Sequence, residues 1–501
     1  VAVGGVIVAV LVLAARWDPK IVTAGVYTTN FVNLLEKGRT VSELLAQDRV
    51  VFYREGLDAT VTVRETAGGD VLSLQVNGKT DASTTADRAT QLLVGYLPLL
   101  WFEPPEHALV IGLGSGMTLG AVLQSSAGRV DCVELEAGVV EAARFFEKVN
   151  HACLDDPRVT LIHDDGRNHL LATDKTYDAI ISEPSNAWIS GISNLFTLDH
   201  YRLMRRRLAP GGVAVQWFQA YAMTERDVRS VLRSFREVFP RAHLWWLPMT
   251  GDLILLAKKG ESVRYDYRRF RAHVTEYPVV IQDLEYGGLG TTGDIFSCFA
   301  MGEDRLGRFC AGAPLNTDDR PRIEFSAPRQ LYRSGLLGNN TLLMLRNLDT
   351  LLAFLDGFDV SRGHRYQTFT ELAEAYLAQK SYLALRRVAE RLVKEFPEEA
   401  AGYYYLGVCQ ARAGQLAQAE GNMDKALRLR RARRGGHYRL GGDGTAIEHN
   451  RALRAELREH LRRHPRDWRA HYRLAMTYAI ERRYRRAGAL LDRAVRLGGR
   501  V

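Results

Sequence analysis

The order of hydrophobic and polar residues predicts a small β-rich domain over residues 21–103. Three short apolar runs are separated by turn residues, at 50–53, 59–63 and 71–76. Runs of this length bounded by Gly, Asn and Asp, such as Asn77-Gly78 after the third run, predict an antiparallel meander. An apolar helix is expected next, at 86–100, ahead of Pro104.

After residue 104 the pattern changes to strands that alternate with helices. Seven apolar runs are typical of strands, at 108–111, 130–135, 159–163, 177–181, 211–216, 244–246 and 253–256. A helix at 117–126 separates the first two strands. Strands in alternation with helices indicate a mostly parallel sheet covered on both faces. We therefore predict an α/β Rossmann-like domain of the class I methyltransferase type over 104–260.

Glycines, a serine and carboxylates follow the first three of these strands. They are Gly112, Gly114, Ser115 and Gly116 after the first strand, Glu134 at the end of the second, and Asp165 and Gly166 after the third. Ligands of such sheets bind at the carboxyl ends of the strands, where glycines let the backbone approach them at a helix N-terminus. Glu134 lies 22 positions after Gly112, a spacing that suits an acidic side chain binding both ribose hydroxyls.

These residues favour an adenosine-containing cofactor of the S-adenosylmethionine type. Asp165 is placed to accept a hydrogen bond from the adenine amino group. An NAD-type cofactor is disfavoured, because position 117, where the third glycine of that pattern is expected, is Met. The alternative is a Rossmann-like scaffold that binds no ligand.

The first 20 residues have the pattern of the end of a transmembrane helix. Val1 to Ala15 is an apolar run closed by Arg16 and Lys20. The run is shorter than the roughly 20 residues that span a bilayer, and its charges follow the apolar run, whereas those of a secretory signal precede it. We expect membrane association with the remaining domains on the cytoplasmic side. A buried segment of a soluble protein is the alternative.

The C-terminal part shows a repeat. The segments 366–399, 400–433, 434–467 and 468–501 each have 34 residues, with small and aromatic residues at matching positions. This period is typical of helix-turn-helix arrays, and the pattern resembles tetratricopeptide repeats, although the third unit is rich in Gly and Arg. Amphipathic helices without repeat geometry are the alternative. Before the repeats we expect an appendage over 261–335 and a linking helical region over 336–365.

The net charge of +9 comes from the repeat region. Residues 366–501 carry 28 Lys and Arg against 15 Asp and Glu. An acidic partner protein or an anionic lipid surface would suit this region, and a solvated basic face is the alternative. No nucleic-acid-reading motif is present. The five cysteines form no C-x-x-C pair, which indicates buried thiols and no metal site.

Several stretches together resemble the spermidine synthase (polyamine aminopropyltransferase) family, in particular its bacterial membrane-fused branch. They are Gly112–Gly116, 133–136, 155–159, 163–168, 177–196 and the later 315–321. The resemblance implies transfer of an aminopropyl group from decarboxylated S-adenosylmethionine to an amine. It also implies that acidic residues line the amine pocket, because a bound amine must lose a proton before it can attack.

The sequence departs from the family pattern around the amine. The family's D-S-S-D-P segment corresponds to residues 183–187, so the first acidic position is Glu183 and the second, which holds the family's proton-accepting Asp, is Asn186. Ser115 replaces an Asp that contacts the cofactor's amino group. In the preceding helix only Asp87 persists, and Arg88 beside it would repel a polyamine.

We therefore expect Glu183, Asn186 and Asp87 to form the catalytic set, with Asp81 and Asp318 as further candidate carboxylates. The predicted function is aminopropyl transfer to a small amine other than putrescine. Alternatives are a methyltransferase that uses S-adenosylmethionine itself, or a non-catalytic membrane-anchored subunit. In each case residues 366–501 are expected to bind a protein partner.

Overall fold

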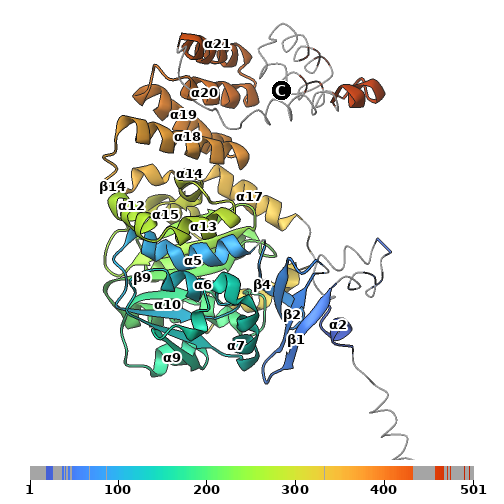
Figure 1. Cartoon of the computed structure of the whole chain (residues 1–501), viewed down its shortest axis with the longest axis vertical. Helices are drawn as coiled ribbons and strands as arrows, with labels where there is room; N and C mark the ends of the chain where they lie inside the picture. Colours follow the sequence, from blue (N-terminus) through green and yellow to red (C-terminus); the bar gives the residue numbers. More distant parts are fainter. Residues whose placement is uncertain are drawn as a thin grey trace, which may run out of the picture. The chain divides into compact units, whose positions relative to one another are not determined.

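The computed structural model divides the chain into two compact units, Val1–Asp359 and Val360–Val501. The described residues are 18–25, 37–38, 40, 43, 45, 48–66, 68–85, 87–331, 333, 335–432, 457–467, 471, 474, 490, 493 and 496. The first unit contains all the described strands, and the described part of the second is helical (Figure 1). The expected membrane segment at 1–17 lies outside the described residues, none of which belongs to a helix long and apolar enough to cross a membrane.

An eight-stranded sheet forms the centre of the first unit, in the order β13-β10-β11-β9-β8-β5-β6-β7. The bounds are β5 His107–Ile111, β6 Arg129–Glu134, β7 Val159–His163, β8 Tyr177–Ser182, β9 Leu208–Gln219, β10 His243–Leu247, β11 Asp252–Lys258 and β13 Phe299–Met301. Neighbours from β7 to β9 are parallel, whereas β11 and β13 run antiparallel to the strands beside them. The expected Rossmann-like α/β fold is confirmed.

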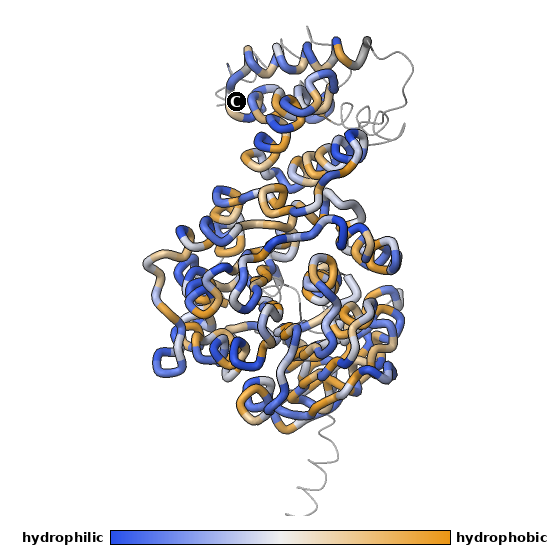
Figure 2. The backbone as a smooth tube through the Cα atoms, turned by 90° about the vertical axis from the view of Figure 1, so that its left-hand side faces the viewer, coloured by the Kyte–Doolittle hydropathy of each residue, from blue (hydrophilic) through white to orange (hydrophobic). Residues whose placement is uncertain are grey.

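Helices cover both faces of this sheet. They are α5 Arg88–Trp101, α6 Met117–Leu123, α7 Ala137–Ala143, α8 Glu147–Asn150, α9 Gly166–Ala172, α10 Leu198–Arg207 and α11 Glu225–Val238. The β5-α6-β6 and β8-α10-β9 connections run in opposite directions along the sheet. Because such connections are right-handed, α6 and α10 lie on opposite faces. Apolar segments run through the middle of the unit, and the helices alternate between hydrophobic and hydrophilic stretches (Figure 2).

The N-terminal β region is a four-stranded antiparallel sheet in the order β1-β2-β3-β4. Its strands are β1 Arg49–Glu55, β2 Thr60–Glu65, β3 Leu72–Val76 and β4 Lys79–Ser83, and the short helix α2 Pro19–Val22 packs on β1. Asn77 and Gly78 have φ values of 51° and 77°, as a two-residue hairpin turn requires. The sequence pattern did not indicate β4, because its residues are mostly polar and lack an apolar alternation.

Residues 261–335 were expected as an appendage but contribute to the core of the first unit. Their elements are β12 Tyr265–Asp266, α12 Tyr267–Glu276, α13 Val279–Tyr286, α14 Thr292–Ser297, β13, α15 Glu303–Cys310 and α16 Arg322–Ser326. Strand β13 extends the main sheet. The Phe270 ring stacks on Trp101 of α5 with centroids 4.9 Å apart, and Phe299 packs edge-on against Trp245 at 5.5 Å. Buried aromatic pairs of this kind stabilise a core beyond the area they bury.

The remaining elements of the first unit are short or lie near its end. They are α17 Leu336–Arg346, β14 Leu355–Asp356, which pairs with β12, and the 3-10 turns Arg144–Phe146, Cys153–Asp155, Ile192–Phe196, Pro328–Gln330 and Leu351–Ala353. Helix α17 and strand β14 fall in the range expected as a linking helical region, so this range belongs largely to the first unit.

The described part of the second unit is built mainly from consecutive helices that pack on one another. They are α18 Arg362–Ala378, α19 Tyr382–Glu395, α20 Ala400–Arg412 and α21 Leu416–Ala432. Two helix pairs therefore stand where the first two repeats were expected. The tetratricopeptide character stays a prediction, because most of the third and fourth units lies outside the described residues.

Close helix packing in the second unit predicts that Gly402→Val destabilises it by about 1–3 kcal/mol. A side chain at Gly402 would meet the Val393 backbone nitrogen at 2.7 Å, whereas a Cβ at Gly421 on α21 meets nothing within 4 Å. Gly421→Ala is the matched control and should be neutral or slightly stabilising. Hydrogen exchange of peptides from α19 and α20 in the full chain measures both effects. Equal protection in the two variants would contradict the prediction.

Candidate active site

The glycine turn after β5 combines close packing with one open position. Gly112, Gly114 and Gly116 have φ values of 92°, 53° and 82°, which favour glycine. A Cβ at Gly112 would lie 2.5 Å from the Glu183 carbonyl oxygen, and one at Gly116 would lie 2.8 Å from Cys153 Sγ. A Cβ at Gly114 would meet nothing within 4 Å. Gly112 and Gly116 are therefore fixed by the protein's own packing, while Gly114 leaves the backbone open to a ligand.

Glu134 stands beside this turn, at the carboxyl end of β6. Its Oε2 accepts a hydrogen bond from the Leu113 backbone nitrogen and its Oε1 accepts one from the Glu136 backbone nitrogen, both at 2.9 Å. Burial raises the pKa of Glu134, and the two backbone donors oppose part of that rise. The carboxylate is thus fixed against the glycine turn, where it can accept hydrogen bonds from a sugar diol.

Asp165 and Gly166 have different surroundings. Asp165 caps helix α9, because its Oδ1 accepts from the backbone nitrogens of Arg167 at 2.9 Å and Asn168 at 2.8 Å. A Cβ at Gly166 would lie 2.3 Å from Ile111 Cγ2, so this glycine is needed for helix–strand packing. Asp165 is half-buried at the same sheet edge as Glu134 and stays a candidate for the adenine contact.

The hydroxyl of Ser115 bonds within the protein, and the expected contact of Ser115 with the cofactor stays a prediction. The side chain is buried, and its Oγ donates to Gln91 Oε1 on α5 at 2.6 Å. This hydrogen bond fastens the glycine turn to α5. The expectation for Ser115 came from its place in the family pattern, where it replaces an Asp. That place does not determine the direction in which the shorter serine side chain points.

Four carboxylates influence one another at the carboxyl end of β8: Asp81, Asp87, Glu183 and Asp252. Glu183 accepts from Thr118 Oγ1, and Asp252 Oδ2 accepts from Thr90 Oγ1 at 2.7 Å. The pKa of Glu183 is raised to about 8, mainly by burial and also by the charges of Asp252 and Asp87. Burial also raises the pKa values of Asp87 and Asp252. Such a cluster favours a bound cation.

Two buried amide side chains, each with one unpaired atom, lie next to the carboxylates. Asn186 is fully buried, and its Nδ2 donates to the Tyr221 hydroxyl at 3.0 Å, while its Oδ1 has no hydrogen-bond partner. Gln219 Nε2 is likewise buried and without a partner. Gln219 is the cross-strand neighbour of Asp252, so their side chains share one face of the sheet. Buried polar atoms are normally paired, so these groups fit a site for a polar ligand.

Two residues considered from the sequence lie outside this cluster. Arg88 pairs with Asp283 at 3.4 Å and lies over the Tyr286 ring at 4.3 Å. The charge of Arg88 is therefore paired with Asp283, and its expected repulsion of the amine stays a prediction. Asp318 forms an ion pair with Arg167 and accordingly has a lowered pKa.

The sequence pattern did not indicate Asp252, Tyr221 or Lys79 as residues of the site. Lys79 Nζ lies 2.5 Å from Asp81 Oδ1, and Asp252 opens strand β11. An isolated Asp at the start of an apolar run was the signal available for Asp252. That signal is weak, because aspartate before a strand is common in turns.

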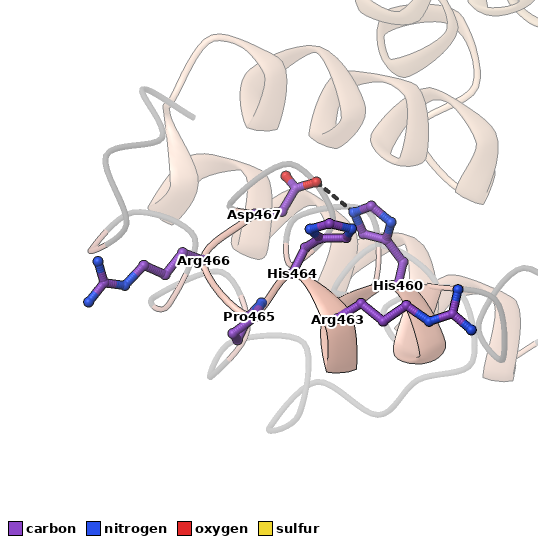
Figure 3. Close-up of a pocket in the computed structure, with 6 residues that line it drawn as sticks. All are labelled: His460, Arg463, His464, Pro465, Arg466 and Asp467. Carbon is purple, nitrogen blue, oxygen red and sulfur yellow. Dashed lines mark hydrogen bonds and ion pairs between the residues drawn. The ribbon is translucent and has the colours of Figure 1, made fainter.

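A separate pocket in the second unit is lined by His460, Arg463, His464, Pro465, Arg466 and Asp467 (Figure 3). His460 Nε2 and Asp467 Oδ2 are 2.9 Å apart, and the rings of His460 and His464 have centroids 4.7 Å apart. Within the described residues, no group of three or more His, Cys, Asp or Glu side chains could hold a metal ion. The cysteines are buried free thiols, as expected.

A protein-family model and several known proteins match this chain. The spermine/spermidine synthase domain matches residues 88–251. A polyamine aminopropyltransferase of Moorella thermoacetica is 31% identical over 192 residues, which cover 37% of this chain and 68% of that protein. The chain belongs to the polyamine aminopropyltransferase family. Family members from Korarchaeum cryptofilum (31% identical, 28% of this chain) and Nitrosomonas europaea (33%, 33% of this chain) are matched over 44% and 52% of their own lengths.

Among solved structures, spermidine synthase from Thermotoga maritima is 21% identical, with a TM-score of 0.38, over 47% of this chain and 88% of that one. A probable spermidine synthase from Corynebacterium glutamicum is 18% identical, with a TM-score of 0.40, over 54% and 97%. The membrane-fused branch of the aminopropyltransferase family stays a prediction for this chain.

For this aminopropyltransferase family member we predict that Glu134→Gln weakens the binding of an adenosyl ligand. One carboxylate oxygen becomes an amide donor, which costs a charge-assisted hydrogen bond to the sugar and about 10–100-fold in affinity. Calorimetry with 5′-methylthioadenosine measures the loss. Glu147→Gln, an exposed change in an Arg144 ion pair, is the control. Full affinity in Glu134→Gln would refute the ribose contact.

Proposed function

We propose that this protein transfers an aminopropyl group from decarboxylated S-adenosylmethionine to a small amine. The observation that supports the proposal is the junction of two features at one sheet edge: an open glycine turn with Glu134 beside it, and the cluster of Asp81, Asp87, Glu183 and Asp252. The negative charge of Asp81 raises the pKa values of both Glu134 and Asp87. An adenosyl donor and a cationic acceptor would therefore bind next to each other.

On the donor side, Glu134 would hold the ribose and Asp165 the adenine, while Gly114 allows the backbone close to the ligand. When bound, the donor supplies a carbon already activated by a sulfonium leaving group. The chain then has two tasks, which are to align the substrates and to take up one proton. The new C–N bond replaces a C–S bond, and 5′-methylthioadenosine is released.

On the acceptor side, Glu183 is our candidate for the proton acceptor. A base works best when its pKa lies near the working pH, and the pKa of Glu183 is raised to about 8, mainly by burial. Asp87 and Asp252 would hold the ammonium group. Asn186 is an amide and would act as a hydrogen-bonding group that positions the acceptor beside Tyr221, which offsets the loss of the family's second Asp.

The proposal predicts selective binding of the decarboxylated donor. A buried acidic cluster favours a ligand that ends in an amine over one that also carries a carboxylate. Calorimetry should give at least about tenfold tighter binding of decarboxylated S-adenosylmethionine than of S-adenosylmethionine. A preference for S-adenosylmethionine would support a methyltransferase, and binding of neither would support a non-catalytic scaffold.

Glu183→Gln should lower kcat by about 10²–10⁴-fold, since a positioned base contributes on that scale. In the unaltered protein kcat/KM should rise with pH through an apparent pKa near 8, because only the ionised Glu183 can accept a proton. This rise of kcat/KM with pH should be absent from Glu183→Gln. Glu261→Gln, an exposed change in the Lys258 ion pair beyond the end of β11, is the control and should keep it. A rise of kcat/KM near pH 8 that persists in Glu183→Gln would exclude Glu183 as the base.

A further inference from the structure

Lys79 has an unusual position for a lysine in a hairpin strand. Its side chain is 12% exposed, and its Nζ lies 2.5 Å from Asp81 Oδ1, which is equally sheltered. The intervening Thr80 is exposed, as the alternation of a strand requires. The ammonium group of Lys79 therefore faces the interior, where most lysines would extend toward water.

The ammonium of Lys79 acts on the acceptor side of the site. Asp81 Oδ1 also accepts from Ser185 Oγ at 2.7 Å, which connects the Lys79–Asp81 pair to the loop after β8. The positive charge of Lys79 lowers the pKa values of both Asp87 and Asp252, against the larger effect of burial. Lys79 is thus within electrostatic reach of three of the four carboxylates.

The buried amides give an independent indication that a ligand binds here. Asn186 Oδ1 and Gln219 Nε2 are buried and without partners. The Tyr221 hydroxyl bonded to Asn186 feels the charges of Asp252 and Asp87. Unpaired buried amide atoms and a cluster of one buried and three half-buried carboxylates therefore occur in the same place, and an amine that donates hydrogen bonds would satisfy them.

We propose that Lys79 is a specificity-determining residue. Its ammonium group occupies the place that the second ammonium group of a diamine would take in the acceptor pocket. The acceptor is therefore a monoamine whose remainder is uncharged. This inference rests on the proposed aminopropyl transfer. A diamine would bring its distal ammonium to a region where Asp81 is already paired with Lys79. Repulsion between the two ammonium groups would oppose binding, and an uncharged tail would avoid that repulsion.

The test compares two amines of equal length, n-butylamine and 1,4-diaminobutane. Their binding to the full chain is measured by calorimetry in the presence of 5′-methylthioadenosine, and transfer is measured separately. We expect n-butylamine to bind the unaltered protein at least about tenfold more tightly than the diamine. In Lys79→Met that ratio should fall by about tenfold or more, because the variant has lost the repelling cation.

Two control variants separate this effect from a general loss of charge. Lys79→Arg keeps the cation and should keep the preference for n-butylamine. Lys258→Met removes an ion-paired lysine at the other end of β11 from Asp252, six residues or roughly 20 Å away, and should also leave the preference unchanged. Comparison of the melting temperatures of Lys79→Met and Lys258→Met shows whether Lys79→Met is folded.

An unchanged ratio in Lys79→Met, or a preference for the diamine in the unaltered protein, would overturn the proposal. Tighter binding of 4-aminobutyrate than of n-butylamine, lost in Lys79→Met, would also overturn it, because Lys79 would then bind a carboxylate tail. If the ratio shifts as expected but no amine is alkylated, the aminopropyl transfer fails and the role of Lys79 in selecting the ligand stands. If an amine is alkylated but the ratio does not shift, the aminopropyl transfer stands and the role of Lys79 in selecting the ligand fails.

Discussion

Carboxylates that are buried close to one another repel, and this repulsion is the constraint on which the site depends. Glu183, Asp87 and Asp252 each have a raised pKa, because burial disfavours their ionised forms, and nearby carboxylates raise the pKa values of Glu183 and Asp87 further. A protein tolerates such an arrangement only if other parts of the fold hold it or if a cation relieves it. Lys79 provides one cation, and the acceptor amine would provide another.

The fold holds the cluster by contacts that leave little freedom. The backbone of Gly112 approaches the Glu183 carbonyl so closely that a side chain there would collide with it. The Glu183 backbone nitrogen donates to the Ile111 carbonyl at 3.0 Å. Hydroxyl groups on α5 and α6, Thr90 and Thr118, donate to two of the carboxylates. The position of Glu183 is therefore set at the junction of β5, β8 and α6, and Asp252 is held by α5.

The same junction links the two halves of the proposed reaction. Glu134 is held by backbone donors of the glycine turn, and Asp81 reaches it electrostatically from the β3–β4 hairpin. Asp81 in turn accepts from Ser185 in the loop after β8. The N-terminal sheet thereby contributes charged groups to a site otherwise built from the Rossmann-like domain, and β4 is the strand that carries them.

The sequence by itself determined the order of strands and helices between 104 and 260, the glycine turn, and the placement of Glu134 and Glu183 at strand ends. These follow from local periodicity and from the rule that carboxyl ends of parallel strands share one edge. Tertiary structure alone decided the direction in which individual polar side chains point. Ser115 bonds to α5, Gly166 serves packing, and Asp252 joins the cluster from a strand near the sheet's far edge.

The sequence alone also did not predict which charged residues form ion pairs. Arg88 is adjacent to Asp87 in the chain, yet its partner is Asp283, nearly 200 residues later. Lys79 looked like an ordinary hairpin lysine because β4 has no apolar alternation to show which of its faces is inward. Electrostatic interactions depend on distance and burial in three dimensions, and a linear pattern of charges contains neither.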